Sequence, residues 1–166
     1  QVTDDFRLKA GLATLNLCLQ HAAQVIILGH LGRPEGKKDP KLSVAPIYQW
    51  LKDHGFDEEL ESGKLKLLEN LRFEVGEDSG DLEYAKSLAS LGEVFINEAF
   101  ASYRPAASTT LLPTLLPSTT GLTFAKEVET LTKVYQDPKQ PLVVILGGAK
   151  VEDKLPVILA MQKIAS

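Results

Sequence analysis

The sequence predicts an α/β protein in which helices flank both faces of a parallel sheet. Two observations support this prediction. Short apolar runs rich in β-branched residues, such as Val25 to Leu28 and Leu142 to Leu146, have the length and composition of buried parallel strands. Segments with helical spacing of apolar residues separate these runs, and this alternation is typical of parallel sheets with helical crossovers.

Helices are predicted where apolar residues recur every three or four positions. In the first helix, Phe6, Ala10 and Leu17 fall on one face, which indicates packing against a sheet. Asp81 stands where an N-cap residue would begin a helix. The predicted helices span residues 5–22, 44–54, 82–91, 109–112, 125–135 and 152–163.

Strands are predicted from the apolar runs and from the turn-forming residues that bound them. The predicted strands span residues 24–29, 64–68, 93–97, 121–124 and 142–146. Two segments between them, residues 57–63 and 69–80, are predicted to be irregular or loop structure.

Composition and charge exclude several classes of protein. The chain has 166 residues, of which 18 are basic and 22 acidic, giving a net charge of −4. This balance lacks the clustered basic face of a nucleic-acid-binding protein, but it leaves room for a local pocket that binds a small anion. Cys18 is the single cysteine, which fits a reducing, cytoplasmic setting. No apolar run approaches the ~20 residues that span a bilayer, so no membrane partner is expected.

Arginines follow three successive predicted strands, at the sheet edge where open parallel sheets bind ligands. Arg33, Arg72 and Arg104 each come after a different strand. Guanidinium groups bind phosphate and carboxylate groups through paired hydrogen bonds. The sequence therefore predicts a site for a small, multiply charged anion.

A glycine pair comes between the last predicted strand and the last predicted helix. Gly147 and Gly148 precede Lys150 and Lys154, and such glycines let backbone N–H groups approach phosphate oxygens. The spacing matches neither the P-loop nor the dinucleotide fingerprint. A plainer interpretation stays open, in which these charges are solvated and His30 is a hydrogen-bonded loop residue. The carboxylates show no metal-ligand spacing.

Five strings of residues occur in a fixed order along the chain. Three of them are Gly29-His30-Leu31-Gly32-Arg33-Pro34, Leu68-Glu69-Asn70-Leu71-Arg72-Phe73 and Gly147-Gly148-Ala149-Lys150-Val151-Glu152-Asp153-Lys154. Residues 2–7 and 88–97 add two more. Together the strings resemble the phosphoglycerate kinase family over essentially the whole chain. The resemblance implies a Rossmann-like, two-lobed cytoplasmic monomer of glycolysis. This enzyme would transfer a phosphoryl group reversibly between 1,3-bisphosphoglycerate and Mg-ADP, giving 3-phosphoglycerate and ATP.

The resemblance implies a role for each matching residue. The substrate anion would be bound by the side chains of Arg7, His30, Arg33 and Arg72 and by the backbone of Leu31 and Gly32. Lys150 would stabilise the phosphoryl group during transfer. Lys154 would hold nucleotide phosphate, beside Gly147 and Gly148. Mg²⁺ would arrive with ADP or ATP, without a protein ligand from this segment.

The region around Arg104 departs from the family pattern. The family has an arginine flanked by histidines, whereas this chain reads Tyr103-Arg104-Pro105-Ala106. A gapless alignment places Pro105 at the family arginine. Arg104 would therefore serve from one position earlier.

The resemblance also implies a division of the chain. Residues 1–124 would form the substrate-binding lobe, residues 125–138 the interlobe helix, and residues 139–166 the first strand–helix unit of the nucleotide-binding lobe. The family's opening strand and most of its nucleotide lobe have no counterpart, so we expect a fold incomplete at both ends and no turnover by these residues alone. The alternative is a truncated, non-catalytic anion-binding module derived from this family.

Overall fold

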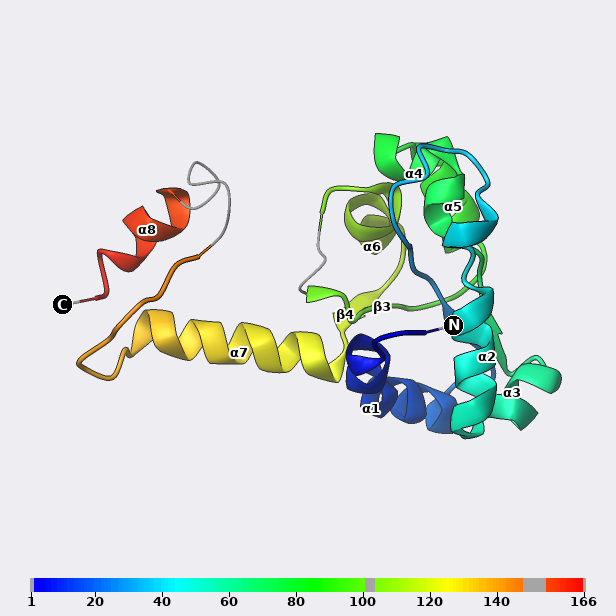
Figure 1. Ribbon diagram of the computed structural model, residues 1–166, viewed down its shortest axis with the longest axis horizontal. Helices are drawn as coiled ribbons and strands as arrows, with labels where there is room; N and C mark the ends of the chain where they lie inside the picture. The colour runs from blue at the N-terminus through cyan, green and yellow to red at the C-terminus, as the bar shows by residue number, and fades with distance from the viewer. Residues whose placement is uncertain (1, 101–103, 148–154, 166) are drawn as a thin grey trace. The chain divides into compact units, whose positions relative to one another are not determined.

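The computed structural model describes residues 2–100, 104–147 and 155–165 (Figure 1). The chain separates into two compact units, Gln1–Phe124 and Ala125–Ser166. The predicted anion site falls within the first unit, which therefore receives most of the description.

The first unit alternates helices and strands, as the sequence predicts. Its helices are α1 (Phe6–His21), α2 (Ala45–Leu51), α3 (Asp57–Glu61), α4 (Val75–Ser79), α5 (Leu82–Ala89), α6 (Leu112–Leu115) and the start of α7 (Leu122–Gln136). Shorter helical turns lie at Pro40–Leu42, Lys52–Phe56, Leu71–Phe73 and Ala107–Leu111. Its strands are β1 (Val25–Ile27), β2 (Leu65–Leu67), β3 (Phe95–Asn97) and β4 (Ser118–Thr120).

All pairing among the described strands is parallel. β1 pairs with β2 so that Val25 lies opposite Leu65, and β3 pairs with β4 so that Phe95 lies opposite Ser118. The described ladders form two pairs rather than one continuous sheet. The α/β class with parallel strands is confirmed.

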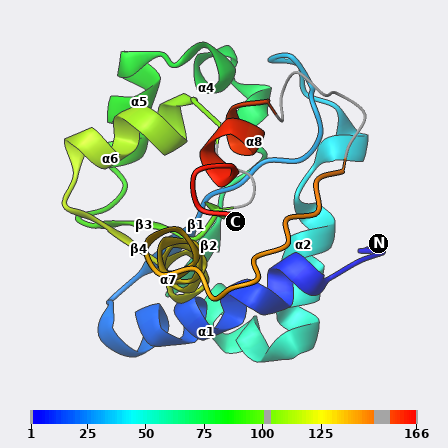
Figure 2. The same ribbon diagram turned by 90° about the vertical axis from the view of Figure 1, so that its left-hand side faces the viewer.

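Helices cover both faces of the strands. α1, α2 and α3 lie on one side, and α4, α5 and α6 lie on the other (Figures 1 and 2). A core cluster on the first side contains the buried residues Leu19, Trp50, Leu51, Phe56, Leu60 and Leu65. The cluster on the second side contains Leu71, Leu88 and Leu112.

The strands and the residues directly after them pack against different clusters. Val25 and Ile27 pack against the first cluster, whereas Leu28 and Leu68 pack against the second. A sheet covered on both faces must be apolar on both, because successive strand side chains point to opposite faces. This is why the run Val25 to Leu28 is continuously apolar, whereas β2 alternates, with Lys66 exposed between Leu65 and Leu67.

Two segments predicted to be irregular or loop structure contain helices. α3 occupies most of residues 57–63, with three acidic residues in its first turn, where they favour the positive helix end. The segment 69–80 holds a 3₁₀ turn and α4. Gly80 ends α4 in a left-handed conformation with φ of 67°, which glycine adopts without strain. Both predictions were wrong because these helices are too short for apolar periodicity to reveal them.

The predicted strand at residues 121–124 was also wrong. The strand lies earlier, at Ser118–Thr120, and α7 begins at Leu122. The helix can begin there because side chains from distant parts of the sequence bind its first N–H groups.

The predicted strand at residues 142–146 is not formed, and it pairs with no other strand in the described part of the chain. In the second unit, α8 (Leu155–Met161) falls within the predicted last helix.

Glu98, just after β3, holds the first turn of α7. Its carboxylate accepts hydrogen bonds from Thr14 Oγ1 at 2.9 Å and from the backbone N–H groups of Thr123 at 3.1 Å and Phe124 at 3.4 Å. The N–H group of Leu122 donates to Thr14 Oγ1 at 2.9 Å. These contacts satisfy N–H groups that have no partner inside the helix, and a carboxylate is favoured at that end by the helix dipole.

Gly121→Ala is expected to destabilise the first unit by about 1–3 kcal/mol, the usual cost of overpacking. A Cβ at this position would clash with Glu98 Oε2 and lie 3.0 Å from Thr14 Cγ2, and hydrogen bonds hold both side chains in place. Urea unfolding measures the loss. Gly92→Ala is the matched control, because its Cβ would meet only the Val94 carbonyl at 4.0 Å. Equal losses in the two variants would contradict the prediction.

Candidate anion-binding site

A hollow of about 360 Å³ brings the three predicted arginines together. We call it the arginine hollow, and its lining residues are Arg33, Glu35, Arg72, Asp78, Arg104 and Pro105. Arg33 follows β1, Arg72 follows β2 and Arg104 follows β3. The arginines therefore meet beyond the carboxyl ends of the parallel strands, where such sheets bind ligands. That they bind an anion stays a prediction.

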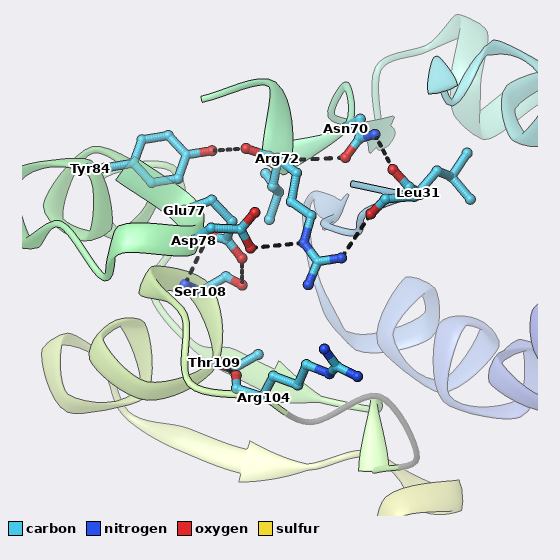
Figure 3. Close-up of polar contacts among 11 residues, drawn as sticks. Leu31, Asn70, Arg72, Glu77, Asp78, Tyr84, Arg104, Ser108 and Thr109 are labelled. Carbon is cyan, nitrogen blue, oxygen red and sulfur yellow. Dashed lines mark hydrogen bonds and ion pairs between the residues drawn. The ribbon is translucent and has the colours of Figure 1, made fainter. Parts of the chain in front are cut away.

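Arg72 is held in place by two hydrogen bonds (Figure 3). Its Nε donates to Asp78 Oδ1 at 2.9 Å, and its Nη1 donates to the carbonyl oxygen of Gly32 at 2.8 Å. The Arg72 side chain is 12% exposed, so it is nearly buried beside the arginine hollow. A guanidinium carries five N–H donors, and these two contacts leave three for an anion.

Asn70 fixes the turn that carries Arg72. Its side chain is buried, and its Nδ2 donates to the carbonyl oxygens of Leu31 at 2.8 Å and Leu42 at 2.9 Å. Its Oδ1 accepts from the Arg72 backbone N–H at 3.2 Å. The amide thus joins the loop after β1 to the turn after β2. Leu31 was predicted to bind the substrate anion through its backbone. In the structure its carbonyl oxygen accepts a hydrogen bond from Asn70 Nδ2, and the backbone role stays a prediction.

The segment after Arg104 is held by a buried carboxyl group. Glu77 is 1% exposed and accepts hydrogen bonds from Ser108 Oγ at 2.5 Å and from the Ser108 N–H at 3.1 Å (Figure 3). Thr109 Oγ1 donates to the carbonyl oxygen of Arg104. A buried carboxyl group needs such partners, because leaving it without hydrogen bonds is costly. Glu77 therefore joins α4 to the segment that begins at Arg104.

His30 interacts electrostatically with charged residues that line the arginine hollow. Burial, together with the positive charges of Arg72 and Arg104, lowers the pKa of His30, and the negative charge of Asp78 offsets this only in part. A neutral imidazole can donate one hydrogen bond and accept another. An anion bound in the arginine hollow would favour the protonated form.

Arg7 and the predicted nucleotide-site residues are the remaining predicted site residues. Arg7 is exposed on the first turn of α1 and does not line it. Gly147 belongs to the second unit. Gly148, Lys150 and Lys154 lie outside the described residues. The predicted nucleotide site therefore stays a prediction.

Sequence reasoning missed several residues that build the site, above all Asn70, Glu77 and Asp78. Asn70 offered a usable signal, because it stands directly before a short turn in a string that was itself singled out. Glu77 and Asp78 offered none, since they lie in a segment predicted to be a loop.

Neither a metal centre nor a membrane span is found in the part of the chain that the structure describes. Its His, Cys, Asp and Glu side chains form no group of three or more that could hold a metal ion. None of its helices is both long enough and apolar enough to cross a membrane.

The fold and the arginine hollow define an α/β protein with clustered arginines at the carboxyl ends of its parallel strands. A family model described as phosphoglycerate kinase matches residues 1–165, and the chain belongs to this family. The sequence-based recognition of the family is confirmed.

Curated relatives and solved structures agree with this assignment. The phosphoglycerate kinases of Moorella thermoacetica and Pseudothermotoga lettingae are each 40% identical to the chain over 176 residues, covering 95% of this chain and 45% and 44% of theirs. The structure of phosphoglycerate kinase from Coxiella burnetii is similar over 99% of this chain, with a TM-score of 0.85 and 31% identity. That of Pyrococcus horikoshii OT3 has a TM-score of 0.82 and 26% identity. The chain covers 46% and 47% of those two chains, so it spans under half the length of these relatives.

Proposed function

We propose that this chain supplies the 3-phosphoglycerate-binding half of a phosphoglycerate kinase, a phosphotransferase of glycolysis. The observation that carries the proposal is the convergence of Arg33, Arg72 and Arg104 on one hollow at the carboxyl ends of the strands. 3-Phosphoglycerate has a phosphate and a carboxylate, and both are groups that arginine binds through paired hydrogen bonds. The family membership supplies the identity of the anion.

In this proposal the protein contributes positioning and positive charge. Phosphoryl transfer needs little covalent work from an enzyme, since catalysis comes from alignment and from stabilising the charge that moves. The three arginines hold the substrate, and His30 adds a hydrogen bond from a ring N–H group. Arg7, exposed on α1, joins the site only if the substrate extends beyond the arginine hollow.

The nucleotide half of the proposal rests on the family resemblance. Lys150 stabilises the phosphoryl group during transfer, Lys154 holds nucleotide phosphate, and Gly147 and Gly148 lie beside the nucleotide. Mg²⁺ comes with ADP or ATP as a counter-charge for the phosphates. The described carboxylates form no group of three or more that could hold the ion. A cytoplasmic monomer is the form we propose.

Titration of the chain with 3-phosphoglycerate tests the substrate half. We expect saturable binding by calorimetry, weakened by added salt because charge pairs dominate the contact. Glycerate, which lacks the phosphate, is the control and should bind more weakly. Absence of 3-phosphoglycerate binding, or equal binding of glycerate, would refute the proposed site.

A second candidate is a truncated module that binds the anion without catalysis, and the departure from the family pattern at Arg104 and Pro105 favours it. Both candidates predict binding by the chain and no turnover by these 166 residues in a coupled ATP assay. Immunoblotting of the source cells separates them. A single band near 18.1 kDa would support the module, and a band more than twice that mass would support the kinase.

A further inference from the structure

Two carboxylates line the arginine hollow, although it is proposed to bind an anion. They belong to Glu35 and Asp78. From charge alone, both should repel an anion and weaken its binding. The structure gives them different partners. Asp78 forms an ion pair with Arg72, whereas Glu35 is in none of the ion pairs between described residues.

The ion pair leaves the anion-binding part of Arg72 free. Asp78 Oδ1 takes the Nε–H group at 2.9 Å, and the Gly32 carbonyl oxygen takes one Nη1–H group at 2.8 Å. Because a guanidinium is planar and rigid, fixing these two donors fixes the direction of the others, on Nη1 and Nη2. An arginine held in this way has less rotamer freedom to lose when an anion binds.

Asp78 lies on α4, and hydrogen bonds to Ser108 hold this helix in place. The preceding residue of α4, Glu77, is buried and accepts both hydrogen bonds from Ser108. Ser108 lies in the segment that begins with Arg104, and the carbonyl oxygen of Arg104 accepts a hydrogen bond from Thr109 Oγ1. Successive residues of α4 therefore hold the Arg72 side chain and, through Ser108, the segment that begins at Arg104 (Figure 3).

We infer that Asp78 is a positioning residue for anion binding: it holds Arg72 in the orientation that presents its outer N–H groups to the anion, and α4 sets the place of Arg72 relative to Arg104. The inference rests on the proposed function of the arginine hollow. Its consequence is opposite in sign to simple charge repulsion, since removing the Asp78 carboxylate weakens anion binding instead of strengthening it.

The test is calorimetric titration of the chain and three variants with 3-phosphoglycerate. Asp78→Ala should weaken binding about tenfold, the effect of freeing one rotamer-rich side chain. Asp78→Asn keeps an acceptor for Arg72 Nε and should lose less affinity than Asp78→Ala. Glu35→Gln removes the other carboxylate of the arginine hollow without removing an ion pair, and it should bind at least as tightly as the unaltered chain.

Unchanged or tighter binding by Asp78→Ala would overturn the inference. If circular dichroism shows that Asp78→Ala does not fold, Asp78→Asn decides, and binding tighter than that of the unaltered chain would overturn it. A weakening of Glu35→Gln equal to that of Asp78→Ala would also overturn it, because both variants would then report a general loss of the fold. Failure of the unaltered chain to bind refutes the proposed function itself, which is a different result.

Discussion

Arg72→Ala should weaken the binding of 3-phosphoglycerate by about 1.5–3 kcal/mol, or roughly ten- to a hundredfold in Kd, the size of hydrogen bonds to charged groups. Two effects act in the same direction. The variant removes the outer N–H groups from the arginine hollow, and it leaves Asp78 there without its ion-pair partner. Calorimetric titration of the chain measures the change.

Two further variants show whether this loss is specific. Lys66→Ala removes one positive charge from an exposed position on β2 that does not line the arginine hollow, so its affinity should change little. Arg72→Lys keeps the charge but loses the planar fork, and should fall between Arg72→Ala and the unaltered chain. If Lys66→Ala weakens binding as much as Arg72→Ala, the arginine hollow is not the binding site.

Leu65→Ala should lower the free energy of unfolding by about 2–5 kcal/mol, the range for large-to-small substitutions in a core. Leu65 is 1% exposed, lies opposite Val25 in the parallel ladder and belongs to the core cluster with α1, α2 and α3. Such a loss is a large part of the 5–15 kcal/mol that typically stabilises a whole domain. Urea unfolding followed by circular dichroism measures it.

Lys66→Ala is again the matched control, since it changes the next residue of the same strand but on its exposed side. Surface substitutions of this kind usually change stability by less than about 0.5 kcal/mol. A loss below about 1 kcal/mol for Leu65→Ala would contradict the cluster assignment, because the site would then collapse without cost. If both variants lowered the free energy of unfolding equally, the loss would come from a change in the strand backbone and not from the Leu65 side chain.

The apolar patterns of the sequence determined the fold class and most of its elements. The runs around Val25, Leu65 and Phe95 form parallel strands, and helical spacing located α1 and α5. Asp81 begins α5 as predicted, with its Oδ1 accepting from the Tyr84 N–H at 2.7 Å. These features are local, since capping and apolar periodicity depend on residues a few positions apart.

The clustering of the three arginines could also be predicted from the sequence. Parallel strands bring their carboxyl ends to one edge, so arginines that follow different strands must lie near one another. The structure shows this for Arg33, Arg72 and Arg104. Arg104 and Pro105 both line the arginine hollow, and that Arg104 serves in place of the family arginine stays a prediction.

The tertiary structure alone decided what holds these arginines and where α7 begins. Asn70 reaches Leu31 across 39 positions of sequence, Glu77 reaches Ser108 across 31, and Thr14 reaches Glu98 across 84. Periodicity reports which face of an element is buried, but it carries no information about the partner of a polar side chain. Each partner is set by the folded chain, in which a buried polar group must find a hydrogen bond among whatever residues the packing brings beside it.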